Sequence, residues 1–161
     1  MTQPATSRRV GDSLVQMTEI VLPEDSNARG SIFGGRVLSL IDKCAAVAAM
    51  RHARGLVVTV SLDSVTFMNK VSVGDVLLLC GRLNAAFGSS MEVEVEVHSE
   101  DPHTGARERT TRALVTMVAV DADARPTRVP RLEATNDDER RRAEEATERR
   151  RRRLAERRSD G

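Results

Sequence analysis

A carboxylate on an apolar helix face is the side chain of this 161-residue sequence best suited to chemistry. Asp42 has Leu38 and Ile41 as neighbours at helical spacing, so it lies on or beside the hydrophobic face of the predicted helix. An ionised carboxylate in that position carries a desolvation cost and requires a partner or a catalytic role. Asp42 could serve as a general base, or it could be a boundary residue paired with Arg36 or Arg82.

Two glycines begin the helix that carries Asp42. Gly34 and Gly35 leave backbone N–H groups at the positive end of the helix dipole, where a carbonyl oxygen that gains negative charge would be stabilised, as in an oxyanion hole. Asp42 follows about two turns later, which leaves room for a substrate carbonyl or a water molecule. Asn27 precedes the glycines, and its amide could orient that water, although asparagine is also common in turns and glycine pairs in tight loops.

Hydrophobic periodicity predicts the elements that position these residues. Apolar residues at spacings of three, four and seven predict a helix over residues 36–53, which Gly55 is placed to end. After this glycine the period changes to two, which is typical of strands. Val93, Val95 and Val97 alternate with glutamates, so we expect the valines to face the helix and the glutamates to face solvent. The predicted strands are residues 13–22, 56–67, 76–83, 90–99 and 109–120.

One long helix against a mainly antiparallel sheet is an α+β arrangement. Since a single helix cannot cover a five-stranded sheet, we expect a dimer or a larger assembly. The composition divides the chain into a disordered leader (1–12), one folded domain (13–132) and a Glu/Arg-rich tail (133–161) that is helical or disordered. We expect the tail to be solvated, with contact of Arg149–Arg153 to phosphate or an anionic surface as the alternative.

Composition argues against several classes of protein. Apolar residues make up 40% of the chain, enough for a hydrophobic core. The lack of Trp and Tyr and the net charge of +1 argue against nucleic-acid binding. Binding through the arginines of the tail stays an alternative that has little support from the neutral body of the chain. Cys44 and Cys80 lie in apolar surroundings with no histidine nearby, which indicates reduced thiols and no metal site. No stretch resembles a signal peptide or a membrane span, so we expect a soluble, cytoplasmic protein without membrane contact.

Several blocks of the sequence resemble the hotdog-fold acyl-CoA thioesterases of the YciA and brain acyl-CoA hydrolase type. The resemblance covers about residues 13–132, and the combination of its blocks is far more specific than any one of them. It implies a hotdog fold, in which an antiparallel sheet of five to six strands wraps around one long central helix. The blocks are Leu22–Gly35, Asp42 with the alanines that follow it, Val60–Phe67, Val73–Asp75 and Gly88–Val93.

The resemblance also implies an activity, which is hydrolysis of acyl-CoA to a carboxylic acid and CoA without a cofactor. Asp42 and Asn27 would form the catalytic pair, contributed by different subunits of a dimer, and Gly35 with Gly34 would hold the oxyanion. Members of the family commonly assemble as trimers of dimers. The positions implied for CoA binding are Ser64, Phe67, Gly88, Ser89, Ser90 and Met91.

Two positions depart from the pattern of the family. Ser89 stands where we expect an arginine, and Asn69-Lys70 replaces a proline that usually follows the strand of Phe67. The missing charge at Ser89 would weaken phosphate contacts unless Lys70 or another arginine compensates. Asp63 is a second candidate carboxylate, for which we favour a structural role over one in the CoA site.

Alternatives to hydrolysis have less support from the residues. A hotdog protein that binds acyl-CoA without turnover would not need both Asn27 and Asp42, and a dehydratase or hydratase would need a histidine near Asp42. No Ser-His-Asp arrangement is visible, and we expect surface or capping roles for His52, His98 and His103.

Overall fold

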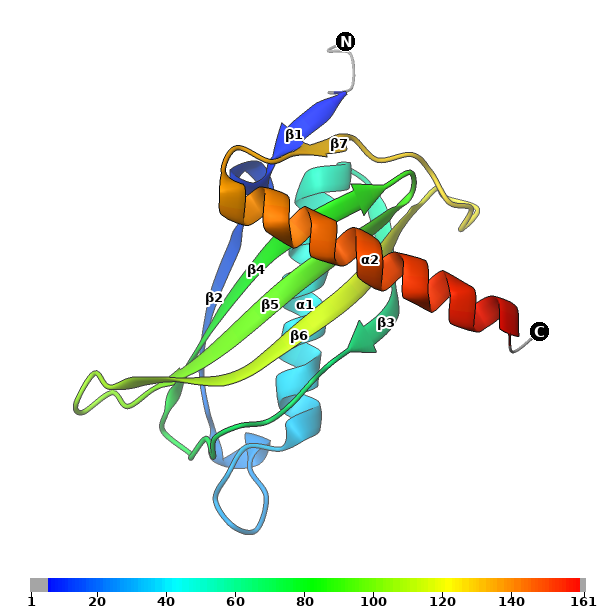
Figure 1. Cartoon of the computed structure of the whole chain (residues 1–161). Helices are drawn as coiled ribbons and strands as arrows, with labels where there is room; N and C mark the ends of the chain where they lie inside the picture. The colour runs from blue at the N-terminus through cyan, green and yellow to red at the C-terminus, as the bar shows by residue number, and fades with distance from the viewer. Residues whose placement is uncertain (1–5, 160–161) are drawn as a thin grey trace.

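An antiparallel sheet of five strands curls around one long helix, α1, in the computed structural model, which describes residues 6–159 (Figure 1). The strand order is β2-β4-β5-β6-β3, and a short parallel pair, β1 with β7, lies beside the sheet. The α+β prediction and the five predicted strands are confirmed. The elements are β1 (Ser7–Arg9), the 3-10 helix η1 (Val10–Ser13), β2 (Val15–Ile20), the 3-10 helix η2 (Pro23–Asp25), α1 (Gly34–Ala53), β3 (Leu56–Asp63), β4 (Val76–Phe87), β5 (Ser90–Glu100), β6 (Arg107–Val120), β7 (Arg131–Glu133) and α2 (Asp137–Ser159).

Most elements differ from the predicted bounds by a few residues, and the ends of β3, β4 and α1 have local explanations. β3 stops at Asp63 because Ser64 has a left-handed backbone with φ of 58°. β4 continues to Phe87 before the turn at Gly88. Helix α1 ends at Ala53 and is capped by Arg54, which takes the left-handed conformation with φ of 55° and donates its N–H to Met50 O, so the prediction that Gly55 ends the helix is wrong by one residue.

The core lies between α1 and the concave face of the sheet. Val93, Val95 and Val97 are fully buried there, as the alternation in β5 predicts. Ala45 and Ala48 of α1 are also fully buried, and their small side chains let the helix approach the strands closely. This packing fixes α1, and with it Asp42, against the sheet.

Gly81 of β4 lies directly against Cys44 of α1. A Cβ atom at this position would lie 2.8 Å from Cys44 Sγ and 3.4 Å from the Cys44 carbonyl oxygen. We therefore expect Gly81→Ala to lower the free energy of unfolding by about 1–3 kcal/mol, the usual cost of overpacking a core. Chemical denaturation checks this, with Gly11→Ala as the control because a Cβ at Gly11 has no heavy atom within 4 Å.

A double-mutant cycle with Cys44→Ala tests the cause of this cost. Without the sulfur atom, the added methyl group of Gly81→Ala has room, so its effect should be close to zero in the Cys44→Ala background. An equally large effect in both backgrounds would show that contact with Cys44 Sγ is not the reason.

The predicted disordered leader is wrong for residues 7–12. Ser7 pairs with Arg131 in the β1–β7 ladder, and Val10 of η1 is buried. These contacts join segments more than a hundred residues apart, which local composition does not reveal. Residues 1–5 of the leader lie outside the described residues.

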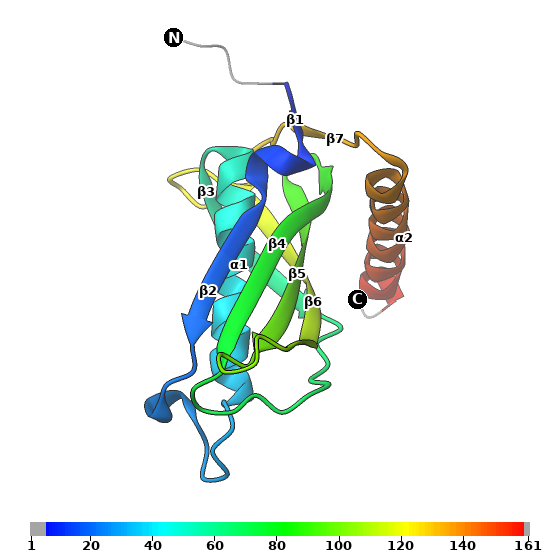
Figure 2. The same cartoon turned by 90° about the vertical axis from the view of Figure 1, so that its left-hand side faces the viewer.

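The Glu/Arg-rich tail forms α2, which crosses the outer face of the sheet on the side opposite α1 (Figures 1 and 2). Ala146 of α2 is fully buried, so the prediction of a solvated tail is wrong for the face of α2 that packs on the sheet, whereas a helix was one of its two predicted states. The predicted solvent-facing glutamates are wrong for the same reason. Glu92 and Glu94 of β5 are only 2% and 1% exposed, because α2 covers them.

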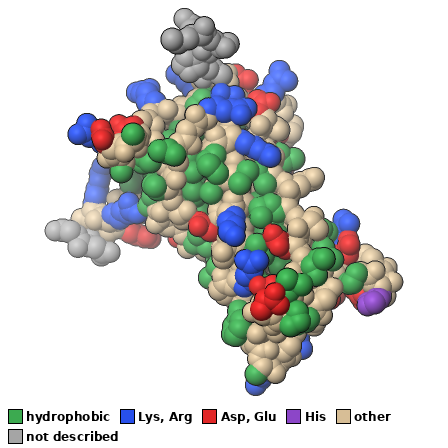
Figure 3. Space-filling view, turned by 180° about the vertical axis from the view of Figure 1, so that it is seen from behind, with side chains coloured by type: hydrophobic (Ala, Val, Ile, Leu, Met, Phe, Trp, Pro, Cys, Tyr) green, Lys and Arg blue, Asp and Glu red, His purple; other side chains and the backbone are tan. Residues whose placement is uncertain are grey.

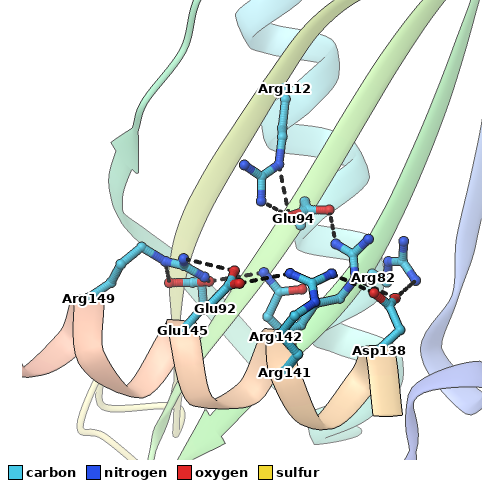
Figure 4. A network of polar contacts seen from close by, with 10 residues as sticks. Arg82, Glu92, Glu94, Arg112, Asp138, Arg141, Arg142, Glu145 and Arg149 are labelled. Atoms are coloured by element: carbon cyan, nitrogen blue, oxygen red, sulfur yellow. Dashed lines mark hydrogen bonds and ion pairs between the residues drawn. The ribbon is translucent and has the colours of Figure 1, made fainter. Parts of the chain in front are cut away.

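Arginines neutralise both buried glutamates (Figure 4). Arg149 of α2 donates to the Glu92 carboxylate from Nη2 at 2.7 Å and from Nε at 3.1 Å. Glu94 accepts hydrogen bonds from Arg142 of α2 and from Arg112 of β6. Burial opposes ionisation of Glu94, but these two guanidinium groups outweigh it and lower its pKa. The ion pairs thereby attach α2 to the sheet.

Candidate functional site

Asp42 lies on α1 with its carboxylate half-buried beside β3. Thr59 Oγ1 donates a hydrogen bond of 2.6 Å to Asp42 Oδ1. The alternative of an arginine partner is wrong, because Arg36 pairs with Asp25 at 3.0 Å and the carboxylate nearest to Arg82 is that of Asp138. The Asp42 carboxylate is thus held by a neutral hydroxyl group, and no arginine among residues 6–159 forms an ion pair with it.

Thr59 is a site residue that the sequence reasoning missed. It is exposed on β3, and the ladder to β6 shifts register between Thr59 and Ser61. Such irregularities often re-aim side chains next to active sites. In the sequence, Thr59 stands out only as the single hydroxyl residue among the apolar residues of 56–60. Threonine is too common in strands for this to indicate a contact with Asp42.

The start of α1 offers unpaired backbone N–H groups. The N–H groups of Arg36 and Val37 donate to Phe33 O, whereas those of Gly34 and Gly35 have no backbone acceptor among residues 6–159. A Cβ on Gly34 would lie 3.3 Å from the Phe67 ring, but nothing lies within 4 Å of the corresponding position on Gly35. An oxyanion can therefore approach the helix start at Gly35.

Asn27 lies in the loop before α1, at the end of the molecule where that helix starts (Figure 1). Its Oδ1 accepts from Arg29 N at 2.9 Å and from Ser31 Oγ at 3.3 Å, and its own N–H donates to Ser31 O. These bonds give Asn27 the turn role that its residue type predicts. No hydrogen bond joins Asn27 to Asp42 within the described chain, so one subunit does not bring the two together.

The residues implied for CoA binding fall into separate places. Phe67 lies against the start of α1, and Ser64 follows β3 beside α2. Gly88 and Ser89 form the β4–β5 turn at the opposite end of the sheet from the Asn27 loop (Figure 1). Ser90, the first residue of β5, is half-buried, and the Met91 side chain is 1% exposed within the core.

An arginine of α2 lies closer to the Ser89 turn than Lys70 does. Lys70 Nζ lies 3.4 Å from Arg29 O in the loop at the far end of the molecule. The Arg150 guanidinium instead lies 4.9 Å from the centre of the Phe87 ring, two residues before Ser89. A positive charge therefore lies beside this turn although the turn itself has none.

The remaining titratable candidates have structural roles. His52 is fully buried with Nε2 2.8 Å from Pro130 O, and burial lowers its pKa, so the expected surface or capping role is wrong. His98 is half-buried, while His103 is exposed in its predicted turn. Asp63 accepts a hydrogen bond of 3.2 Å from Arg153, in agreement with the structural role we favoured. Burial raises the pKa of Cys44 to about 12, which excludes a reactive thiolate at neutral pH.

Within residues 6–159, no three side chains of His, Cys, Asp or Glu are grouped so that they could hold a metal ion. No helix in that range is both long and apolar enough to cross a membrane.

Comparison with known proteins decides the family. Residues 29–106 match the Thioesterase superfamily. The chain is 39% identical to the uncharacterized acyl-CoA thioester hydrolase YkhA of Bacillus subtilis, over 82% of this chain and 76% of that protein. This chain belongs to the hotdog acyl-CoA thioesterase family. It is also 34% identical to the acyl-CoA thioester hydrolase YciA of Escherichia coli K12, over 78% of this chain and 98% of YciA, which confirms the resemblance seen in the sequence.

Solved structures of acyl-CoA thioesterases share the fold of this family member. An apo-hexameric acyl-CoA thioesterase is 44% identical, with a TM-score of 0.89 over 94% of this chain and 97% of that chain. An acyl-CoA hydrolase from Staphylococcus aureus, in complex with butyryl-CoA and CoA, is 32% identical, with a TM-score of 0.87 over 96% and 94% of the two chains. The sheet wrapped around α1 is therefore the hotdog fold.

Proposed function

We propose that this hotdog thioesterase hydrolyses acyl-CoA to a carboxylic acid and CoA. One observation carries the proposal. The half-buried carboxylate of Asp42 accepts a hydrogen bond from Thr59, and Asp42 lies on the same helix, α1, whose N-terminus is open at Gly35. Relatives that match most of the chain are acyl-CoA thioester hydrolases by name, and the Staphylococcus aureus relative has been solved with butyryl-CoA and CoA. A carboxylate and an oxyanion site are the two groups that thioester hydrolysis requires.

The reaction follows from the positions of these groups. Asp42 takes a proton from a water molecule, whose oxygen attacks the thioester carbonyl carbon. The carbonyl oxygen gains negative charge, which the Gly35 N–H and the positive end of the α1 dipole stabilise. The C–S bond then breaks and CoA leaves as a thiolate, which needs no strong acid, and the proton on Asp42 passes to that thiolate or to solvent. Direct attack by the carboxylate is the variant of this mechanism, with hydrolysis of an anhydride as its second step.

Asn27 of a second subunit completes the site in this proposal. Within one chain its Oδ1 serves the loop, whereas no residue among 6–159 accepts a hydrogen bond from its Nδ2. That amide can therefore donate to a water or a carbonyl at the Asp42 of a partner subunit. Variants of the Staphylococcus aureus enzyme with alanine in place of an aspartate, an asparagine or a threonine have been solved, and these residue types match Asp42, Asn27 and Thr59.

The surface of the molecule supports a dimer that assembles further. β3 is at the edge of the sheet, and Leu56, Val58 and Val60 on it are 61%, 44% and 45% exposed. Figure 3 shows hydrophobic side chains gathered on the face of the molecule seen from the α1 side. Pairing of two such faces would cover them and bring two active sites together. An acyl-CoA thioesterase with the same fold and the thioesterase y2039 of Yersinia pestis are hexameric, which a trimer of such dimers would produce. The free thiols of Cys44 and Cys80 agree with a cytoplasmic protein.

A panel of acyl-CoA substrates of increasing chain length tests the proposal. We expect release of free thiol, with a clear preference for some chain lengths, when the purified full chain is mixed with each substrate and a thiol-reactive dye. Binding of acyl-CoA without thiol release from any of them would instead support a non-catalytic acyl-CoA-binding protein. Absence of both binding and release would contradict both functions.

A further inference from the structure

A groove of about 350 Å³ lies between the second half of α2 and the end of β3. Its volume is within the range of small-molecule sites, roughly 300–1,000 Å³. In Figure 1 this part of α2 passes β3 and extends beyond the sheet. The residues that line the groove are Asp63, Ser64, Arg149, Arg152, Arg153 and Glu156.

The charges of α2 are divided between its two halves. Residues 149–158 contain seven arginines and one glutamate, whereas residues 137–148 contain six acidic residues and three arginines. Cations near the C-terminus of a helix are favourable in general. The concentration of charge therefore makes the groove side of α2 a region of positive potential on a chain whose net charge is +1.

Two of the three groove arginines are hydrogen-bonded to a carboxylate and the third is not. Arg149 donates to Glu92, and Arg153 donates to Asp63 at 3.2 Å. Arg152 is 65% exposed and forms a long ion pair with Glu148, whose Oε1 lies 3.8 Å from Arg152 Nε, beyond hydrogen-bond distance. Its guanidinium group is thus available to a ligand at the rim of the groove.

We propose that this groove binds the phosphate groups of the CoA part of the substrate, with Arg152 and the Ser64 hydroxyl as donors. The inference rests on the proposed thioesterase function, since CoA is the only polyanion which that reaction supplies. A guanidinium group donates two parallel hydrogen bonds to phosphate oxygens, and a hydroxyl adds a neutral donor. Arg150, beside the Phe87 ring, extends the positive surface toward the β4–β5 turn.

Kinetics of Arg152→Gln test the proposal. With acyl-CoA as the substrate, we expect KM to rise about tenfold with kcat little changed, because phosphate contacts bind the substrate and its transition state equally. With the same acyl group on N-acetylcysteamine, a thioester without phosphates, KM should not change. The rise for acyl-CoA should shrink at high ionic strength, where the wild-type contact is itself screened.

Arg151→Gln is the matched control. It removes the same charge one residue away, but Arg151 is 70% exposed, pairs with Glu148 and does not line the groove. A general field effect would raise KM equally in both variants, and a folding defect in Arg152→Gln would affect both substrates. Either result, or an unchanged KM for acyl-CoA, would overturn the proposal.

Binding measured by calorimetry tests the groove proposal independently of the proposed thioesterase function. CoA and pantetheine can be titrated into wild type, Arg152→Gln and Arg151→Gln without any turnover. A chain that hydrolyses no thioester, but loses CoA affinity specifically in Arg152→Gln, would contradict the thioesterase and support the groove. Equal CoA affinity in the two variants would contradict the groove, whatever the activity.

Discussion

Asp42→Asn should lower the rate of thiol release from acyl-CoA by roughly 10²- to 10⁴-fold, the usual contribution of a general base. Asparagine keeps the size of the side chain and can still accept the hydrogen bond from Thr59, so the fold should be unchanged. The loss should appear in kcat, because a group that acts on the attacking water contributes mainly in the transition state. Steady-state kinetics over a range of acyl-CoA concentrations, with unfolding curves of both proteins, check this result.

Asp123→Asn is the control for this substitution, since it neutralises an exposed carboxylate in the turn after β6. It should leave kcat within a factor of about two, because surface substitutions away from a site have small effects. Activity of Asp42→Asn close to that of Asp123→Asn would exclude Asp42 as the base and as the nucleophile.

Mixed oligomers locate the partner of Asp42 in the same assay. Asn27→Ala should also be inactive, and a mixture of the two variants should regain activity after subunit exchange. A dimer with one subunit of each kind contains one site with both wild-type residues if each site takes Asp42 from one subunit and Asn27 from the other. No recovery in a mixture that has exchanged subunits would place both residues in one chain.

The two faces of β5 show which features of the fold the sequence predicts and which it does not. The valines at 93, 95 and 97 were correctly predicted to face the helix, since a strand with one buried face alternates at period two. The same alternation predicted the wrong surroundings for Glu92 and Glu94. Their partners, Arg149 and Arg142, follow about fifty residues later in a helix that local composition assigns to solvent. Long-range charge pairing has no local periodicity, so the pattern could not reveal it.

The candidate site shows the same limit. Apolar neighbours in one helix were enough to single out Asp42, and the glycines to single out the helix start. Thr59 was missed because its contact with Asp42 depends on how β3 lies against α1, which neither segment encodes alone. Asn27 has a loop role within its own chain, and the catalytic role proposed for it requires a second subunit, whose position the sequence of one chain does not encode.

Arg149→Met should lower the free energy of unfolding by about 3–5 kcal/mol, the range for breaking a buried ion pair by removing one partner. The Glu92 side chain is 3% exposed, and without Arg149 its remaining donor is the neutral Asn84 Nδ2 at 3.0 Å. When α2 detaches from the sheet, the Glu92 carboxylate returns to water. Part of the loss of stability should therefore appear as local detachment of α2 and not as global unfolding. Chemical denaturation gives the total, and hydrogen exchange of the α2 amides should be at least about 100-fold faster than in wild type.

Neutralising Glu92 tests whether its unpaired charge causes the loss of stability in Arg149→Met. Adding Glu92→Gln to Arg149→Met removes the charge and keeps an amide of the same size, so most of the stability should return. Arg151→Met, which removes an exposed arginine of the same helix, should change stability by less than about 0.5 kcal/mol. If Arg149→Met denatures like wild type and its α2 amides exchange at the wild-type rate, the ion pair does not hold α2. In that case another contact would have to hold α2 on the sheet, because Arg152 lines the groove beside Ser64 only while α2 stays there.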